Sequence, residues 1–192
     1  MGTRITDVTI SEFDALFTSF EHTAYRLEIL QVYDVSYEVE PYEAFLAGHP
    51  LPYDPAKDQW VSMIRDAVRS GKVFQRVHVV REPLTDYLRY ELGRSYPPNV
   101  EAGEDIRILV ARPGQWPMST CGEILPGLKD YWLFDSSDLW VMEYADDGTF
   151  LYIEQVTEPA MIVTAARRRD AALHQAIQYR DYMRRGQLLA AS

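Results

Sequence analysis

The clearest strand signals of the sequence lie between Gly103 and Val156. This stretch contains the segments Gly103-Glu104-Asp105-Ile106-Arg107 and Asp130-Tyr131-Trp132-Leu133-Phe134-Asp135. Runs of strand length, rich in aliphatic and aromatic residues, follow one another at 106–111, 131–134, 139–144 and 150–156. Asp147-Gly148 separates the last two runs, and tight hairpin turns favour glycine because they need a positive φ. We therefore expect residues 131–156 to form a three-stranded antiparallel meander.

Helix and strand patterns flank this stretch. Residues 23–31 and 73–80 alternate apolar and charged side chains, which predicts strands with one buried face. Helical spacing predicts a helix at 13–20, a short helix that begins at Pro41, and a helix capped by Asp58. It also predicts a helix that begins at Pro83 and that Pro97-Pro98 must break. A last helix is expected over Ala165–Arg185. Phe17 and Trp60 lie on apolar helix faces and are the expected core anchors.

These patterns predict the fold class. We expect one α+β domain over residues 1–192, with flexible ends at 1–10 and 186–192. Its sheet is mainly antiparallel, with a C-terminal meander, and is packed by N-terminal, central and C-terminal helices. A chain of 192 residues with 47% hydrophobic residues is long enough to bury a core without metal or disulfide support.

Composition also narrows the cellular setting. Cys121 is the one cysteine of the sequence and cannot form an intramolecular disulfide, which fits a reducing compartment. The N-terminal residues lack the apolar core of a signal peptide, and no apolar run approaches the roughly 20 residues that cross a bilayer. We expect a cytoplasmic protein that does not contact membranes.

The formal charge is −10, which argues against direct nucleic-acid binding by this chain alone because phosphate contacts need clustered cations. Residues 160–192 hold six arginines and two aspartates, net +4, and the remaining 13 basic and 27 acidic residues give −14. Arg167, Arg168 and Arg169 lie near a helix start, where the helix dipole disfavours cations. We expect these three side chains to face water and to bind an acidic protein surface.

A second candidate site is a polar cluster on the central sheet, a tentative ligand-binding site formed by Glu104, Asp105, Arg107, Tyr131 and Asp135. Asp105 and Arg107 project from the same face of one strand. Carboxylates beside an arginine bind cations, amines or polar metabolites. The same residues also form ion-pair networks that only join strand ends, so a structural role is the alternative.

No sequence motif dictates a reaction. The chain has no glycine-rich phosphate loop, zinc-binding helix, cysteine pair or nucleophile elbow. Its four histidines, at positions 22, 49, 78 and 174, are far apart and lack the spacing of metal ligands. We therefore expect no catalytic residue, no metal and no cofactor, and an enzyme is the less favoured class.

Seven segments carry a family resemblance: residues 20–28, 45–48, 76–80, 83–87, 103–107, 131–136 and 169–172. The most distinctive sequences are Thr-Ala-Tyr-Arg-Leu-Glu at 23–28, Pro-Leu-Thr-Asp-Tyr at 83–87, Gly-Glu-Asp-Ile-Arg at 103–107 and Asp-Tyr-Trp-Leu-Phe-Asp-Ser at 130–136. In this order they resemble an actinomycete family of uncharacterised proteins, over residues 11–180. The resemblance implies a gene beside a helix-turn-helix regulator and implies no particular activity. The strand–turn–strand run with its basic helix also resembles phospholipase-D-like sensor domains, but the paired His-x-Lys motifs of that superfamily are absent.

Three functions fit these observations. The first is a non-enzymatic regulatory or accessory protein that binds a helix-turn-helix regulator, a small effector or both. The alternative is a small-molecule-binding protein or an enzyme that uses the acidic/arginine cluster on the central sheet. The third is an interaction module without a ligand. The missing catalytic motifs favour the first and third, and the gene neighbourhood that the resemblance implies favours the first over the third.

Overall fold

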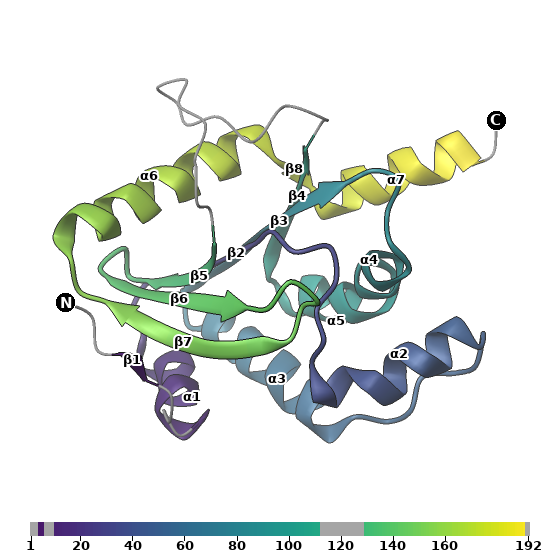
Figure 1. Ribbon diagram of the computed structural model, residues 1–192, viewed down its shortest axis with the longest axis horizontal. Coiled ribbons are helices and arrows are strands. Elements are labelled where there is room, and N and C mark those ends of the chain that lie inside the picture. The colour runs from purple at the N-terminus through teal and green to yellow at the C-terminus, as the bar shows by residue number, and fades with distance from the viewer. Residues whose placement is uncertain (1–3, 6–9, 112–128, 191–192) are drawn as a thin grey trace.

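The computed structural model describes residues 4–5, 10–111 and 129–190. Eight strands form one sheet in the order β1-β7-β6-β5-β2-β3-β4-β8 (Figure 1). The strands are β1 Arg4–Ile5, β2 Thr23–Glu28, β3 Val73–Arg81, β4 Asp105–Ala111, β5 Asp130–Phe134, β6 Asp138–Tyr144, β7 Phe150–Val156 and β8 Ile177–Gln178. Cys121 lies outside the described residues, as do residues 1–3, 6–9 and 191–192 of the two expected flexible ends. Residues 4–5 form β1, residue 10 begins the first helix, and residues 186–190 belong to the last helix.

Helical segments connect and cover these strands. They are α1 Ile10–Ser19, the 3-10 turn Ser36–Glu38, α2 Val39–Leu46, α3 Pro55–Arg69, α4 Asp86–Tyr90, a π-helical segment Glu91–Ser95, α5 Tyr96–Ala102, α6 Pro159–Gln175 and α7 Tyr179–Ala190. None of the helices in the described part of the chain combines the length and the apolar character that a membrane span requires.

The sheet is mixed and mostly antiparallel, which confirms the predicted α+β class. β2, β3 and β4 are parallel neighbours, and every other adjacent pair is antiparallel. The parallel strands are joined by crossovers through α2–α3 and through α4–α5, because parallel neighbours need long connections. β5, β6 and β7 form the predicted meander, with positive φ at Asp135 and Ser136 in one turn and at Gly148 in the other.

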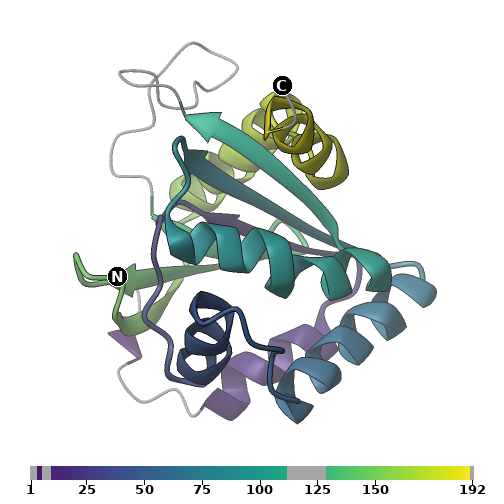
Figure 2. The same ribbon diagram turned by 90° about the vertical axis from the view of Figure 1, so that its right-hand side faces the viewer.

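Helices cover both faces of the sheet (Figures 1 and 2). α1, α3 and α5 lie on one face and α6 on the other. Phe17 is buried, at 6% exposure, with its ring centroid 4.8 Å from that of Trp132 and 5.0 Å from that of Trp60. Phe17 is therefore a core residue, while Trp60 is half-buried and packs against the edge of the same cluster.

Two local predictions are wrong. α3 begins at Pro55, and its cap is Asp54, whose carboxylate accepts hydrogen bonds from the amides of Ala56 and Lys57 at 2.9 and 3.2 Å; Asp58 already lies in the first turn. Pro97-Pro98 does not end a helix. The helical path continues through the π-helical segment into α5, and both prolines fall in the first turn of α5.

Two longer elements also differ from expectation. The last helix is split into α6 and α7 by β8, which pairs with the otherwise free edge of β4 through Ile108↔Ile177. An unpaired strand edge offers hydrogen-bonding groups that a short strand satisfies. β2 was expected to bury one face, but β5 and β3 flank it and helices cover both faces, so Arg26 and Glu28 are buried as well.

Candidate functional site

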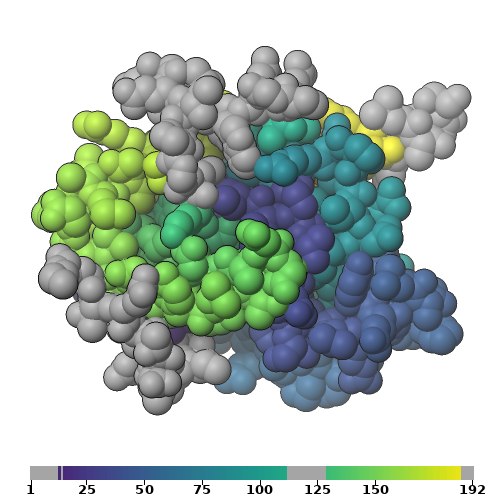
Figure 3. All heavy atoms as spheres, in the orientation of Figure 1, coloured from purple at the N-terminus to yellow at the C-terminus, as the bar shows by residue number. Residues whose placement is uncertain are grey.

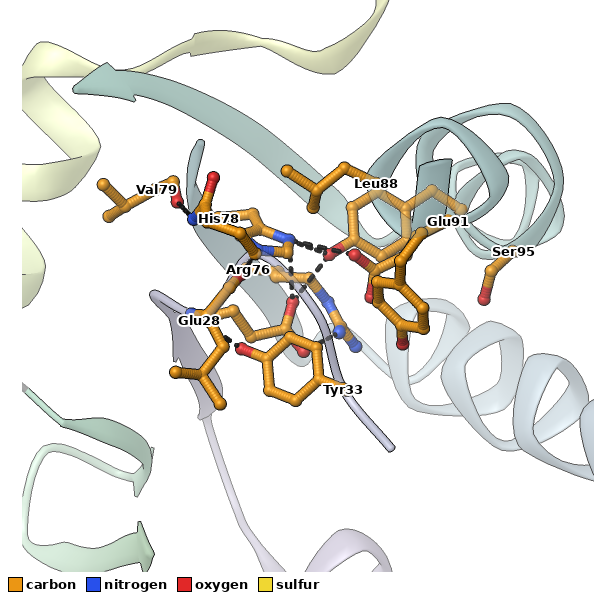
Figure 4. A network of polar contacts seen from close by, with 12 residues as sticks. Glu28, Tyr33, Arg76, His78, Val79, Leu88, Glu91 and Ser95 are labelled. Atoms are coloured by element: carbon orange, nitrogen blue, oxygen red, sulfur yellow. Dashed lines mark hydrogen bonds and ion pairs between the residues drawn. The ribbon is translucent and has the colours of Figure 1, made fainter. Parts of the chain in front are cut away.

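Two central strands direct ionisable side chains to one face of the sheet. Side chains alternate along a strand, so Arg26 and Glu28 share a face of β2, and Arg76 and His78 share a face of β3. The parallel register places Arg26 opposite Arg76 and Glu28 opposite His78. Figure 4 shows Glu28, Arg76 and His78 meeting side chains from the helical path above β3. Four ionisable groups therefore meet where β2 and β3 approach their carboxyl ends.

Three more carboxylates complete what we call the buried network. Glu91 comes from the π-helical segment, Glu104 from the residue before β4, and Asp130 from the start of β5. The seven members are less than 9% exposed: Arg26, Glu28, Arg76, His78, Glu91, Glu104 and Asp130. Charged groups are rarely buried unless they are paired, so the network is the chief polar feature of the core.

Five members form a chain of alternating charge. Arg26 Nη2 lies 3.2 Å from Asp130 Oδ2, and its Nε lies 3.4 Å from Glu28 Oε1. Arg76 links two carboxylates: its Nη1 lies 2.7 Å from Glu28 Oε1, and its Nε lies 2.8 Å from Glu104 Oε1. Loss of solvation offsets much of the attraction in a buried ion pair, so the network fixes geometry more than it adds net stability.

The environment shifts the pKa values of these carboxyl groups in opposite directions. Burial favours the neutral form of Glu28, but Arg76 and Arg26 outweigh it and hold the pKa of this carboxyl well below its usual range. Burial raises the pKa of Asp130 to about 6 despite the opposing effects of Arg26 and of a hydrogen bond from Tyr33. Neighbouring acids therefore differ in how strongly they hold a proton.

His78 is fully buried and its two ring nitrogens have different neighbours. Nε2 lies 2.8 Å from the carbonyl oxygen of Leu30. Nδ1 lies 2.7 Å from the Tyr96 hydroxyl, 3.1 Å from Glu91 Oε2 and 3.6 Å from Glu28 Oε2. Burial alone would lower the pKa of His78, but the carboxylates of Glu91 and Glu28 outweigh it and raise this pKa to about 9.

Glu91 is directed into the network from the π-helical segment, as Figure 4 shows. Such wide turns change the direction of side chains and are frequent at functional sites. Glu91 is 5% exposed, and its Oε2 atom is buried without a hydrogen-bond partner among the described residues. Among these residues its close polar neighbour is His78 Nδ1, at 3.1 Å, so the ion pair with His78 is what compensates its burial.

The network continues outward through half-buried groups. Glu38 accepts a hydrogen bond from the Tyr87 hydroxyl at 2.6 Å, and burial together with Glu91 raises the pKa of Glu38 to about 7. Lys57 Nζ lies 3.3 Å from Ser95 Oγ. Burial, followed by the nearby Arg76, lowers the pKa of Lys57. The polar groups thus extend from the sheet toward α2 and α3.

The structure does not unite the polar cluster expected from sequence. Asp105 and Arg107 do pair, at 2.9 Å, on β4. Asp135 follows β5, three strand positions away, which corresponds to about 14 Å at a strand spacing of about 4.8 Å. The expected cluster assumed that β4 and β5 are neighbours, but β2 and β3 lie between them.

The other predicted members have separate roles. Asp135 accepts hydrogen bonds from the backbone amides of residues 21, 22 and 23 at 2.7–2.8 Å, which lowers its pKa and holds the entry to β2. Tyr131 lies on the opposite face of the sheet and donates to the carbonyl oxygen of Ala165 at 2.9 Å. Glu104 alone belongs to the buried network, where Asn99 Nδ2 also donates to it at 2.7 Å.

The arginine run is only partly solvent-exposed. Arg167 is exposed on α6, as expected, but Arg168 is half-buried. Arg169 donates to Ser136 Oγ at 2.7 Å and pairs with Asp170 at 2.9 Å, and its side chain is only 17% exposed. The expectation that all three side chains face water is wrong, because α6 lies against the meander and directs two of them to the sheet.

Sequence reasoning missed five network residues: Arg26, Glu28, Arg76, His78 and Glu91. A signal was present in β2 and β3, where charged residues alternate with apolar ones. Recognising β2 and β3 as parallel central strands would have predicted burial of their charged faces.

The fold and the buried network define the class of this protein. It is an α+β protein with ionisable groups buried in its core beneath a π-helical turn. The chain belongs to the family described as Domain of unknown function (DUF6879), whose profile matches residues 11–184. No curated protein sequence matches it at a significant level.

Two solved structures are similar at low identity. NucT from Helicobacter pylori aligns with a TM-score of 0.46 and 7% identity, over 93% of this chain and 97% of that chain. TrmBL2, an archaeal chromatin protein described with a novel mode of DNA binding, aligns with a TM-score of 0.45 and 7% identity, over 93% of this chain and 54% of that chain. Likeness at this level carries no functional argument.

Proposed function

We propose that this protein is a non-enzymatic regulatory or accessory protein that binds a helix-turn-helix transcription regulator, a small effector or both. The resemblance to an actinomycete family encoded beside such regulators supports a protein partner. The formal charge of −10 supports a role that reaches DNA through a partner and not through this chain alone.

The observation that carries the proposal is an acidic surface around α2, which we call the α2 surface. Residues 34–58 contain six carboxylates and one lysine. Tyr37 and Tyr53 are 70% and 78% exposed there, and Val39 and Leu46 are also exposed. Figure 1 places α2 at the periphery, and Figure 3 shows its region as a continuous blue area at the lower right.

This surface has the chemistry that a basic protein partner recognises. DNA-binding domains carry clustered cations, which an acidic surface attracts and orients. Exposed tyrosines supply apolar contact area with a polar end and are enriched among residues that dominate binding energy. Arg167 on α6 is exposed, but the neighbouring Arg168 and Arg169 are half-buried and already contact other groups. We therefore place the main docking surface on α2.

Binding of the purified regulator, measured by isothermal titration calorimetry, tests the proposal. The test variant is Tyr37→Ala with Glu40→Lys and Glu43→Lys, because all three side chains are exposed. We expect at least a tenfold rise in Kd with an unchanged melting curve. The matched control is Met161→Ala with Arg167→Glu on α6, also both exposed, and it should bind like the wild type.

Salt provides a second check. Binding through the α2 surface should weaken between 0.05 and 0.5 M salt, because the Debye length is about 8 Å at physiological ionic strength and shorter above it. If only the α6 control loses binding, docking uses the arginine helix. If the wild type does not bind the regulator, the protein-partner half of the proposal is wrong.

A further inference from the structure

Three side chains of the buried network direct one ligand atom each to a common point. His78 Nδ1 lies 3.1 Å from Glu91 Oε2 and 3.6 Å from Glu28 Oε2. Atoms of these three residues that can bind a metal all lie within 4.8 Å of one another. Four-coordinate zinc with bonds of about 2.1 Å separates its ligand atoms by about 3.4 Å. The two measured distances are close to this separation.

Neighbouring hydrogen-bond partners orient these atoms, as they commonly orient the ligands of a bound metal ion. Histidine ligands usually hydrogen-bond through the other ring nitrogen, and His78 Nε2 lies 2.8 Å from the Leu30 carbonyl oxygen. Nδ1 is therefore the ring nitrogen that faces the cluster, and a metal ion bound there would replace its hydrogen bond to the Tyr96 hydroxyl at 2.7 Å. Arg76 binds Oε1 of Glu28, so Oε2 of this carboxylate faces His78. The Tyr96 hydroxyl donates to that same Oε2 at 2.6 Å.

Glu91 adds a buried carboxylate to these atoms. Glu91 is 5% exposed and points into the cluster, and its Oε2 atom, which lies 3.1 Å from His78 Nδ1, has no hydrogen-bond partner among the described residues. A buried carboxylate oxygen is costly unless a cation or a donor completes it, and a metal ion at this point would take the role that the His78 ring has here. The π-helical turn places this oxygen beside His78 rather than toward solvent.

Charge balance points to a dication. With the carboxylates counted as ionised, Arg26 and Arg76 balance two of the four buried carboxylates. The remaining two negative charges face a single histidine, which supplies at most one positive charge. A divalent ion beside these carboxylates would offset the excess negative charge of the buried network.

We propose that Glu28, His78 and Glu91 form a binding site for one first-row divalent metal ion, with Zn²⁺ the best match. Nitrogen and carboxylate donors at these spacings suit Zn²⁺, and the same donors accept Co²⁺, which serves as a spectroscopic probe. The site lies in the core and does not depend on the α2 surface or on the proposed partner.

The test uses the full chain after chelator treatment. Zn²⁺ is added to the native protein and also during refolding from urea, because the site is buried. Competition with a chromophoric chelator should give one equivalent of bound Zn²⁺ per chain and an increase in melting temperature. Co²⁺ should give the visible absorption of a low-coordinate site.

Two variants separate ligand loss from misfolding. Glu91→Gln retains the side-chain shape and should bind Zn²⁺ at least tenfold more weakly and lose the Co²⁺ absorption, with an unchanged circular dichroism spectrum. His78→Gln should behave alike. The control changes the exposed pair Glu21→Gln and His22→Gln, in which His22 Nε2 lies 3.9 Å from Glu21 Oε2, and should bind like the wild type. The proposal is overturned if the wild type binds no Zn²⁺ by either route, if Glu91→Gln binds as tightly as the wild type, or if the surface control abolishes binding.

Discussion

Replacement of Glu28 by glutamine tests whether the buried network behaves as a desolvated unit. Glutamine keeps the length of the side chain but removes the charge that Arg26 and Arg76 share. The Glu28 side chain is 7% exposed, so water cannot replace the lost carboxylate without rearrangement of the core. Breaking a buried pair by removing one partner typically costs about 3–5 kcal/mol. We expect Glu28→Gln to lower the free energy of unfolding by this amount at pH 7.

The pH dependence follows from the direction of the pKa shift. The pKa of Glu28 in the folded protein lies below its usual value of 4.5. The stabilisation from this carboxylate is therefore fully present above about pH 4.5 and is lost as the pH falls through the folded pKa. The difference between the wild type and Glu28→Gln should be largest near pH 7 and should shrink under acid conditions.

Urea unfolding, followed by circular dichroism in the presence of a chelator, measures the effect without a metal contribution. The matched control is Arg89→Gln, which breaks the exposed Asp86–Arg89 pair at 3.0 Å. Exposed pairs contribute at most about 1 kcal/mol, so this control should change little. A loss below about 1 kcal/mol for Glu28→Gln, with an unchanged urea dependence, would refute the reasoning and show that both arginines remain solvated.

Three further outcomes are expected. Burial raises the pKa of Glu38 to about 7, so Glu38 should make wild-type stability fall as the pH rises from about 4.5 to 7. Glu38→Gln should reduce this slope and be more stable at pH 8 by on the order of 1 kcal/mol, and an unchanged slope in urea unfolding would contradict this. Phe17→Ala should lower the free energy of unfolding by about 3–5 kcal/mol in the same assay. Trp60→Ala should lower it by less, because Trp60 is only half-buried. Small and equal losses for the two variants would exclude a core role. Gly148→Ala should lower the melting temperature more than Gly71→Ala. Both glycines have a positive φ, but only at Gly148 would the new Cβ atom meet a backbone oxygen, that of Val32, at 2.6 Å. Equal decreases in melting temperature would argue against this close contact.

Local patterns in the sequence determine much of the fold. The β5–β6–β7 meander is predictable because alternation, strand length and turn residues act within a few residues of each other. The break between α6 and α7 is not predictable in this way. Ile177 continues a helical pattern, and only the free edge of β4 makes a short strand preferable there.

The candidate site depends on contacts between distant parts of the chain. Glu28 and His78 lie 50 positions apart, and the parallel register of β2 and β3 makes them neighbours. Glu91 reaches them because the π-helical turn directs it to the sheet. In contrast, Asp105 and Asp135 both lie at the ends of strands, yet two other strands separate them.

The sequence by itself determined the α+β class, the meander and most helix positions, because hydrophobic periodicity and turn chemistry are local properties of the chain. Tertiary structure alone decided which charged residues are buried. Strand order and register set the neighbours of each side chain, and burial depends on what covers both faces of the sheet. Arg26 and Arg107 both alternate with apolar residues on strands, but β2 is central and β4 lies near the edge, so Arg26 is buried in the network and Arg107 remains partly exposed.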